Sequence, residues 1–170
     1  MRFFSGFGLQ NEKELFDFWI SGSEVEVAGF SYGAIKALEY LLSYPKRVDR
    51  LILLSPAFFN NKDERFKRLQ ILAFSKDKKS YMDRFFKNIS SGIDMKQYYK
   101  EPTKEELQEL LYYRWERDKI EELKRRGVEV EVILGEKDKI IDSKEALNFF
   151  KDIATTYYIK GANHILKEVK

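Results

Sequence analysis

The stretch AGFSYGA, residues 28–34, places Ser31 between Gly29 and Gly33. A valine-containing strand pattern precedes it at residues 24–28, and apolar residues recur at helical spacing from about residue 34 onward. A serine on a sharp turn from a strand into a helix is the local arrangement of an activated nucleophile, and flanking glycines allow close packing there. The alternative is an ordinary serine in a loop of small residues.

A nucleophilic serine needs a histidine to take its proton and a carboxylate to orient that histidine. The only histidine, His164, lies in a loop after the strand predicted at 155–159, and Asp138 lies in the loop after the strand predicted at 128–134. With Ser31, both follow the carboxyl ends of strands, the edge at which parallel sheets form their sites. We therefore predict Ser31, Asp138 and His164 as the catalytic residues.

The sequence leaves alternatives for two of these residues. His164 could be a surface or core histidine without a catalytic role. Three further carboxylates near Asp138 could orient the histidine in its place, namely Glu136, Asp142 and Asp152.

An oxyanion hole requires two backbone N–H donors, one from the residue after the nucleophile and one from a loop after an earlier strand. Tyr32 follows Ser31 and supplies the first donor. We assign the second to Phe7 in the early loop FSGFG, residues 4–8. The alternative for that loop is a simple turn.

Strand and helix patterns alternate along most of the chain. Short strands are predicted at 2–5, 24–28, 51–54, 128–134 and 155–159. Helical patterns between them indicate an α/β fold with about five mainly parallel strands. Because the pattern from residue 58 to residue 126 is entirely helical, we predict a core at 1–57 and 127–170 with a helical cap inserted at 58–126.

Helix starts are predicted at two capping signals. Asn11 is followed three residues later by Glu14, and Thr103 is followed in the same way by Glu106. Each pair is typical of a helix whose first residue is preceded by a side-chain cap.

Two strands alternate valine with glutamate, at 24–28 and at 128–132. A parallel sheet covered on both faces usually has continuous apolar strands instead. We infer that one face of the sheet is poorly covered by helices or is met by a partner subunit. The alternative is that the alternation belongs to the edge regions of the sheet.

The composition is that of one folded domain, with 170 residues, 44% hydrophobic and 35% charged. No run reaches the ~20 apolar residues that span a bilayer, and no signal-peptide core is present, so we expect a cytoplasmic protein without membrane association. The absence of cysteine excludes disulfides and thiol catalysis, and a single histidine argues against a hydrolytic metal site. We expect neither a metal nor an organic cofactor.

The chain resembles the α/β-hydrolase family in the order of three motifs, GFSYG at 29–33, GEKD at 135–138 and GANH at 161–164. It resembles more closely the short bacterial esterases that act on the methyl ester of pimeloyl-acyl-carrier protein in biotin synthesis. That similarity extends over essentially the whole chain and rests on the stretches MRFFSGFGLQNE, GFSYGAIKALEY, FKRLQ, SYMDRF, GEKDKI and NHIL.

The chain departs from the general family in two ways. Ser5-Gly6 stands where the family carries His-Gly. The family's first two strands are missing, as are the strand and helix that in the family precede the strand leading into the turn of the nucleophile. The resemblance therefore implies a truncated α/β-hydrolase. If all crossovers are right-handed and the strands progress across the sheet in order, helices accumulate on one face, and a homodimer or a lone terminal helix could cover the other.

The resemblance also implies a reaction. Ser31 attacks the methyl ester of pimeloyl-acyl-carrier protein, and methanol leaves with a proton from His164. Asp138 orients the imidazole, while the N–H groups of Tyr32 and Phe7 hold the oxyanion. Water then releases the acyl group from the serine.

The predicted cap has a basic side and an aromatic side. Between residues 60 and 100 there are eleven basic and five acidic residues, whereas the whole chain has a formal net charge of only +3. Acyl carrier proteins are strongly acidic, so we predict one as the partner, contacted by Arg65, Arg68, Arg84 and Lys87. We predict an aromatic substrate channel formed by Phe58, Phe66, Phe74, Tyr81, Phe85 and Phe86. The alternative is an ordinary amphipathic cap with a solvated face.

Two other functions are compatible with the same residues. One is a generic small-ester carboxylesterase or thioesterase, and the other is an inactive hydrolase-fold protein that serves in binding. Nucleic acid is not an expected partner because the net charge is modest and no nucleic-acid motif is present.

Overall fold

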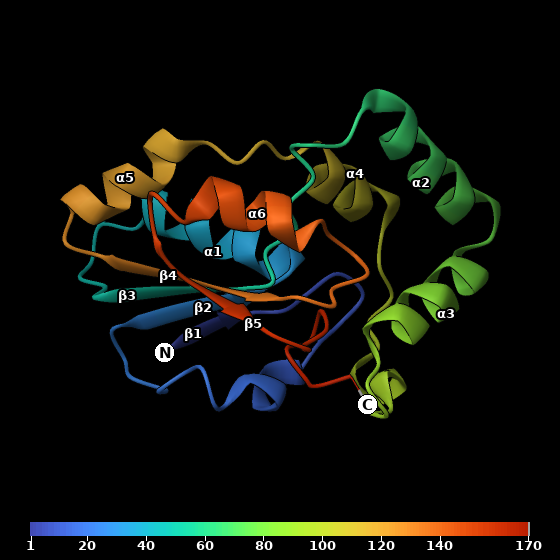
Figure 1. Ribbon diagram of the computed structural model, residues 1–170, viewed down its shortest axis with the longest axis horizontal. Helices are drawn as coiled ribbons and strands as arrows, with labels where there is room; N and C mark the ends of the chain where they lie inside the picture. Colours follow the sequence, from blue (N-terminus) through green and yellow to red (C-terminus); the bar gives the residue numbers. More distant parts are fainter. Residues whose placement is uncertain (170) are drawn as a thin grey trace.

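A computed structural model describes residues 1–169 and contains one five-stranded sheet, in which every neighbouring pair of strands is parallel. The strands lie in chain order across the sheet (Figure 1). They are β1 (Arg2–Phe4), β2 (Glu26–Phe30), β3 (Arg50–Leu54), β4 (Glu129–Gly135) and β5 (Thr155–Ile159). The predicted α/β fold with five parallel strands is therefore confirmed.

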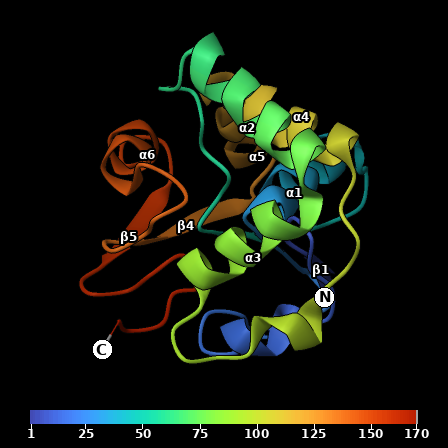
Figure 2. The ribbon, with the colours of Figure 1, turned by 90° about the vertical axis from the view of Figure 1, so that its right-hand side faces the viewer.

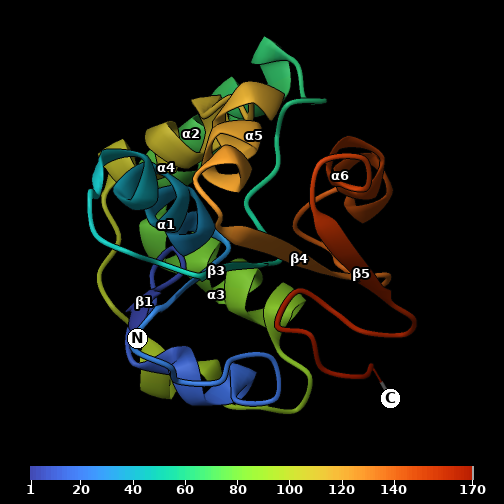
Figure 3. The ribbon, with the colours of Figure 1, turned by 90° about the vertical axis from the view of Figure 1, so that its left-hand side faces the viewer.

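The two faces of the sheet are covered differently. Figures 1 and 3 show α1 (Tyr32–Ser43), α5 (Arg117–Arg125) and α6 (Ser143–Phe150) on one face, and the 3₁₀ helix η1 (Glu12–Phe16) on the other. Because the strands progress in one direction, the connection from β1 to β2 through η1 has the opposite hand to the other three. The four crossovers therefore do not all share one hand, although α1, α5 and α6 do accumulate on one face (Figure 1), as anticipated for strands in chain order.

Aromatic packing holds η1 on its face of the sheet. The ring of Phe16 lies 4.7 Å from that of Phe30 on β2 and 6.1 Å from that of Phe3 on β1. The predicted cap at Asn11 is wrong, because Asn11 has a left-handed backbone with φ of 62° and its side chain caps nothing. The segment forms a five-residue 3₁₀ helix that turns its apolar residues, and Glu12, toward the sheet.

The cap consists of α2 (Glu64–Lys76), α3 (Lys78–Ile89), η2 (Met95–Tyr98) and α4 (Lys104–Tyr112). Figure 2 shows α2 and α3 in front of the end of the sheet at which the strands finish. The capping box of Thr103 and Glu106 is confirmed at the start of α4. Helix α5 packs against α1 and β4, so the predicted cap range also contains a helix that lies on the core. No helix in residues 1–169 combines the length and apolarity that a bilayer span requires.

Two of the alternating glutamates form buried ion pairs on the sparsely covered face of the sheet. Glu26 on β2 and Glu131 on β4 are buried, and Arg50 on β3 lies between them. Arg50 donates through Nε and Nη2 to Glu131 at 2.7 and 2.8 Å, and through Nη1 to Glu26 at 2.9 Å. The inference that helices cover one face poorly is borne out, because only η1 lies on the face that carries these glutamates (Figure 1), and the ion pairs with Arg50 accompany their burial there. The same face is open beside β5, where Tyr157 is exposed.

Candidate active site

Ser31 occupies a strained turn between β2 and α1, with φ of 52° and ψ of −113°. Its flanking glycines are required by close backbone contacts. A Cβ on Gly33 would lie 2.0 Å from the carbonyl oxygen of Phe4, and a Cβ on Gly29 would lie 2.2 Å from that of Gly33. Neither contact can be relieved by a side-chain rotation, because both partners are backbone atoms. The turn that presents Ser31 thus depends on glycine at both positions.

We expect Gly33→Ala to lower the free energy of unfolding by at least about 3 kcal/mol, because the added methyl group forces β1 away from α1. The measurement is urea denaturation followed by circular dichroism. Gly92→Ala is the control for backbone strain alone, since Gly92 has a positive φ, which Gly33 lacks, and no atom lies within 4 Å of its added Cβ. A loss for Gly33→Ala no larger than that for Gly92→Ala would contradict the view that the contact with Phe4 limits position 33.

The structure brings Ser31, His164 and Asp138 into one hydrogen-bonded series. His164 Nε2 lies 2.9 Å from Ser31 Oγ, and His164 Nδ1 lies 2.6 Å from Asp138 Oδ2. The side chains of His164 and Asp138 have no solvent exposure. A serine, an imidazole and a carboxylate in this order form the geometry that activates a nucleophile.

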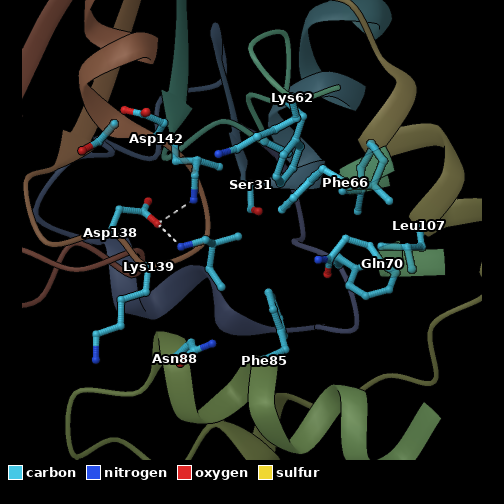
Figure 4. A pocket seen from close by; sticks show the side chains of 18 of the residues that line it. Ser31, Lys62, Phe66, Gln70, Phe85, Asn88, Leu107, Asp138, Lys139 and Asp142 are labelled. Atoms are coloured by element: carbon cyan, nitrogen blue, oxygen red, sulfur yellow. Dashed lines mark hydrogen bonds between the residues drawn. The ribbon is translucent and has the colours of Figure 1, made fainter. Parts of the chain in front are cut away.

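The carboxylate of Asp138 is held by backbone donors as well as by the imidazole. Its Oδ1 accepts hydrogen bonds from the N–H groups of Ile140 at 2.7 Å and Ile141 at 3.1 Å, which Figure 4 draws as dashed lines. Two of the alternatives bind elsewhere: Glu136 accepts from the N–H of Gly161, and Asp142 caps α6. Among residues 1–169 no carboxylate other than Asp138 forms a hydrogen bond with His164.

The loop that carries His164 is fixed by a residue that sequence reasoning did not single out. The side chain of Asn163 donates to the carbonyl oxygen of Ile89 at the end of α3 and accepts from the N–H of Lys167. The ring of Phe30 packs against the imidazole at a centroid distance of 5.1 Å. Only the position of Asn163 directly before the histidine could have suggested this role.

Both predicted oxyanion donors are available for a ligand. Within residues 1–169, neither the N–H of Phe7 nor that of Tyr32 donates a hydrogen bond. The side chain of Phe7 packs between the cap residues Phe74 and Phe85, at 6.0 Å from each ring. The loop after β1 therefore lies between the sheet and the cap and leaves its amide unengaged.

A cavity of about 710 Å³ opens onto Ser31 between the cap and the loop that follows β4. Figure 4 shows the Ser31 hydroxyl between Phe66 and Leu107 on one side and Asp138 on the other, with Phe85 opposite. A volume of this size accommodates a small-molecule ligand. Among the predicted channel residues, Phe66, Tyr81 and Phe85 line the cavity.

The other three predicted channel residues do not line the cavity. Phe58 is buried against Phe150 in the core beneath α6, and Phe74 and Phe86 are buried inside the cap. Their assignment to the channel is therefore wrong. A helical pattern shows that these rings face inward, but it does not distinguish a cap interior from a cavity wall.

Helix α4 supplies apolar lining that the prediction missed. Leu107, Leu110 and Leu111 are buried and line the cavity from one side of that helix. Their helical spacing after the capping box at Thr103 was the available signal. Phe59 adds a further apolar surface from the segment that leads into the cap.

The polar groups of the cap side include a neutral phenol. Burial raises the pKa of Tyr81 to about 12, and its hydroxyl donates to Gln70 Oε1 at 3.0 Å.

Of the four predicted partner-binding residues, Arg84 lines the cavity, whereas Arg65, Arg68 and Lys87 are exposed on the outside of the cap. Residues 1–169 contain no cluster of side chains that could hold a metal ion.

Comparisons with known proteins agree with this geometry at the level of the fold. No protein-family model and no curated protein sequence matches the chain. Among solved structures, an esterase (EaEST) from Exiguobacterium antarcticum is 19% identical with a TM-score of 0.64, over 82% of this chain and 59% of that one. The naproxen esterase (carboxylesterase NP) from Bacillus subtilis is also 19% identical with a TM-score of 0.56, over 83% and 53%. MenH from S. aureus is 14% identical with a TM-score of 0.60, over 96% and 85%.

The protein has the α/β-hydrolase fold in a truncated form. The chain spans only 59% and 53% of the length of the two esterases. Its sheet has five strands, and its cap follows β3 directly. Within this fold, Ser31 occupies the turn after a central strand, and Asp138 and His164 follow the last two strands.

Proposed function

We propose that this protein is a serine carboxylesterase. The observation that carries the proposal is the series of hydrogen bonds from Ser31 through His164 to Asp138 at the base of the cavity. Ser31 Oγ attacks the ester carbonyl while His164 Nε2 takes its proton and then passes it to the departing alcohol. The N–H groups of Phe7 and Tyr32 stabilise the oxyanion, and water, activated by the same imidazole, releases the acid.

The proposed substrate is the methyl ester of pimeloyl-acyl-carrier protein, with methanol as the first product. The resemblance in sequence motifs supports this choice, as does the apolar part of the cavity lining, from the α4 leucines and the cap phenylalanines, which suits an acyl chain. A carrier-bound substrate has a large protein part that stays outside the cavity. The enzyme therefore needs a surface beside the cavity entrance that binds an acidic partner.

The outer side of α2 is the surface that fits an acidic carrier protein. Its solvent-facing residues recur at helical spacing and combine charge with exposed apolar groups, with Leu69 at 52% and Leu72 at 61% exposure. We define this α2 stripe by Arg65, Arg68, Leu69, Leu72 and Lys76. Basic residues attract an acidic helix over a distance, and the two leucines supply apolar contact once it binds.

Reversing charge on the α2 stripe is expected to affect hydrolysis of the carrier-bound substrate and not that of a free ester. Arg65→Glu combined with Arg68→Glu should raise KM for the carrier substrate at least tenfold, with kcat and hydrolysis of a short free ester unchanged. Steady-state kinetics at low and high salt measures KM for both proteins, and added salt should narrow the difference in KM between the double variant and wild type. The control is Lys124→Glu on α5, an exposed charge reversal on the core. Equal KM values for the double variant and wild type would reject the stripe as the docking surface.

The proposed reaction is tested with methyl-pimeloyl carrier protein in a gel-shift assay, beside a short free methyl ester. Demethylation by the native protein that disappears in Ser31→Ala supports both the nucleophile and the substrate. Hydrolysis of the free ester alone would contradict the carrier substrate and leave a generic esterase. If the protein hydrolyses neither substrate and a fluorophosphonate does not label Ser31, the result would indicate a binding protein.

A further inference from the structure

Glu12 is a fully buried carboxylate beneath the loop that carries the Phe7 amide. It has 0% solvent exposure at the start of η1. Its Oε1 accepts a hydrogen bond of 2.7 Å from the N–H of Gly6, and its Oε2 has no hydrogen-bond partner among the described residues. Burying such a group is costly, so its presence at this position requires an explanation.

The loop between β1 and η1 is held on two sides. On one side, Glu12 binds the amide of Gly6, whose own carbonyl accepts from the N–H of Leu9 at 3.2 Å. On the other side the cap pairs with the end of the loop, because the backbone N–H of Lys100 donates to the carbonyl oxygen of Gly8 at 2.9 Å. Phe7 lies between these two points, and its N–H donates no hydrogen bond to any acceptor in residues 1–169.

Gly6 and Phe7 share one peptide unit, so the orientation of the Gly6 backbone determines where the Phe7 N–H points. The ring of Phe30 limits movement of Gly6, since a Cβ there would lie 2.8 Å from that ring. Within this confined space, the hydrogen bond from the Gly6 N–H to Glu12 holds the Ser5–Gly6 peptide, and the bond from the Leu9 N–H to the Gly6 carbonyl holds the Gly6–Phe7 peptide, so the two together limit rotation about Gly6. An amide that is already oriented costs no reorganisation when charge develops on the substrate.

We propose that Glu12 is a positioning residue that orients the Phe7 N–H toward the oxyanion formed at Ser31. The inference rests on the proposed esterase function. Glu12 does not touch the substrate, and it acts through Gly6. Hydrogen bonds to an ionised acceptor are shorter and stronger than neutral ones, which explains a carboxylate rather than an amide side chain here.

Burial raises the pKa of Glu12, and the hydrogen bond from the Gly6 amide opposes this rise. The carboxyl group can accept from that amide through Oε1 whether or not it is protonated. Glu12→Gln therefore keeps the acceptor and removes the charge. Glu12→Asp keeps the charge but withdraws the acceptor by one methylene group, and Glu12→Ala removes both.

The experiment compares these variants on a short ester and on its thionoester, in which sulfur replaces the carbonyl oxygen. Because sulfur accepts hydrogen bonds poorly, the thionoester gains little from the oxyanion donors. We expect Glu12→Ala and Glu12→Asp to lower kcat for the ester about 10²-fold, with KM nearly unchanged and a much smaller loss on the thionoester. Glu12→Gln should retain kcat within about tenfold of wild type, since loss of charge weakens one hydrogen bond without removing it.

Two results would overturn the proposal. One is a folded Glu12→Asp variant with wild-type kcat, and the other is an equal loss on ester and thionoester, which would indicate a purely structural role. If Glu12→Ala does not fold, the Glu12→Gln and Glu12→Asp variants are sufficient to decide whether the proposal holds. Glu24→Ala, an exposed glutamate in the same connection from β1 to β2, is the control. If the wild-type protein hydrolyses no ester, the proposed esterase function is rejected. If the wild-type protein is active and Ser31→Ala is not, the esterase function stands, and the Glu12 variants then test the positioning role alone.

Discussion

Ser31→Ala is expected to lower kcat for ester hydrolysis by about 10⁴- to 10⁶-fold while the protein remains folded. Without Oγ no acyl-enzyme can form, and His164 has no hydroxyl from which to take a proton. The oxyanion donors Phe7 and Tyr32 remain in place, so a small residual rate above that of water is expected. The Oγ forms one hydrogen bond, to His164, so its removal costs stability only on the order of 1 kcal/mol.

The rate is measured with a short ester in wild-type and variant protein, beside labelling by a fluorophosphonate and urea denaturation. Ser43→Ala is the matched control because it removes a serine hydroxyl from the other end of the same helix, α1. Its activity should equal that of wild type. A Ser31→Ala rate within tenfold of wild type would exclude Ser31 as the nucleophile and with it the proposed mechanism.

Arg50→Ala is expected to lower the free energy of unfolding by about 3–5 kcal/mol. Arg50 is the cation between two buried carboxylates, and Glu26 and Glu131 are 2% and 7% exposed. Its removal leaves two negative charges close together in a site of low polarity. Ser21 continues to donate to Glu26 through its N–H and its hydroxyl, but Glu131 loses both of its hydrogen bonds to Arg50.

Urea denaturation of wild-type and variant protein at neutral pH measures this loss. Arg47→Ala is the control, since Arg47 forms an exposed ion pair with Asp49 and should change stability by less than about 1 kcal/mol. Equal effects of the two substitutions would show that the buried ion pairs contribute no more than a surface pair.

The elements that the sequence predicted well are those specified by neighbours along the chain. The turn around Ser31 was recognisable because its strand, its glycines and its helix are contiguous. The capping box at Thr103 is likewise a local interaction, and the structure contains it. The failed cap at Asn11 is the exception, since contacts of η1 with the sheet overrode the local pattern.

The cavity lining could be predicted only in part. Amphipathic spacing identified inward-facing rings, but Phe66 and Phe85 reach the cavity whereas Phe74 does not. The difference depends on how α2, α3 and α4 pack against one another, which no local pattern contains. The same limit applies to the buried Glu26, because its partner Arg50 is 24 residues away along the chain.

The sequence by itself determined the order of strands and helices and the candidate residues Ser31, Asp138 and His164, because these depend on local patterns and on the order of the chain. Only the tertiary structure decided which carboxylate meets the histidine, which face η1 covers, and that Glu12 lies beneath the Phe7 loop. Each of these is a contact between segments distant in sequence. Their pairing follows from the burial of apolar surface and of charge in the whole molecule, so it is not encoded in any single stretch.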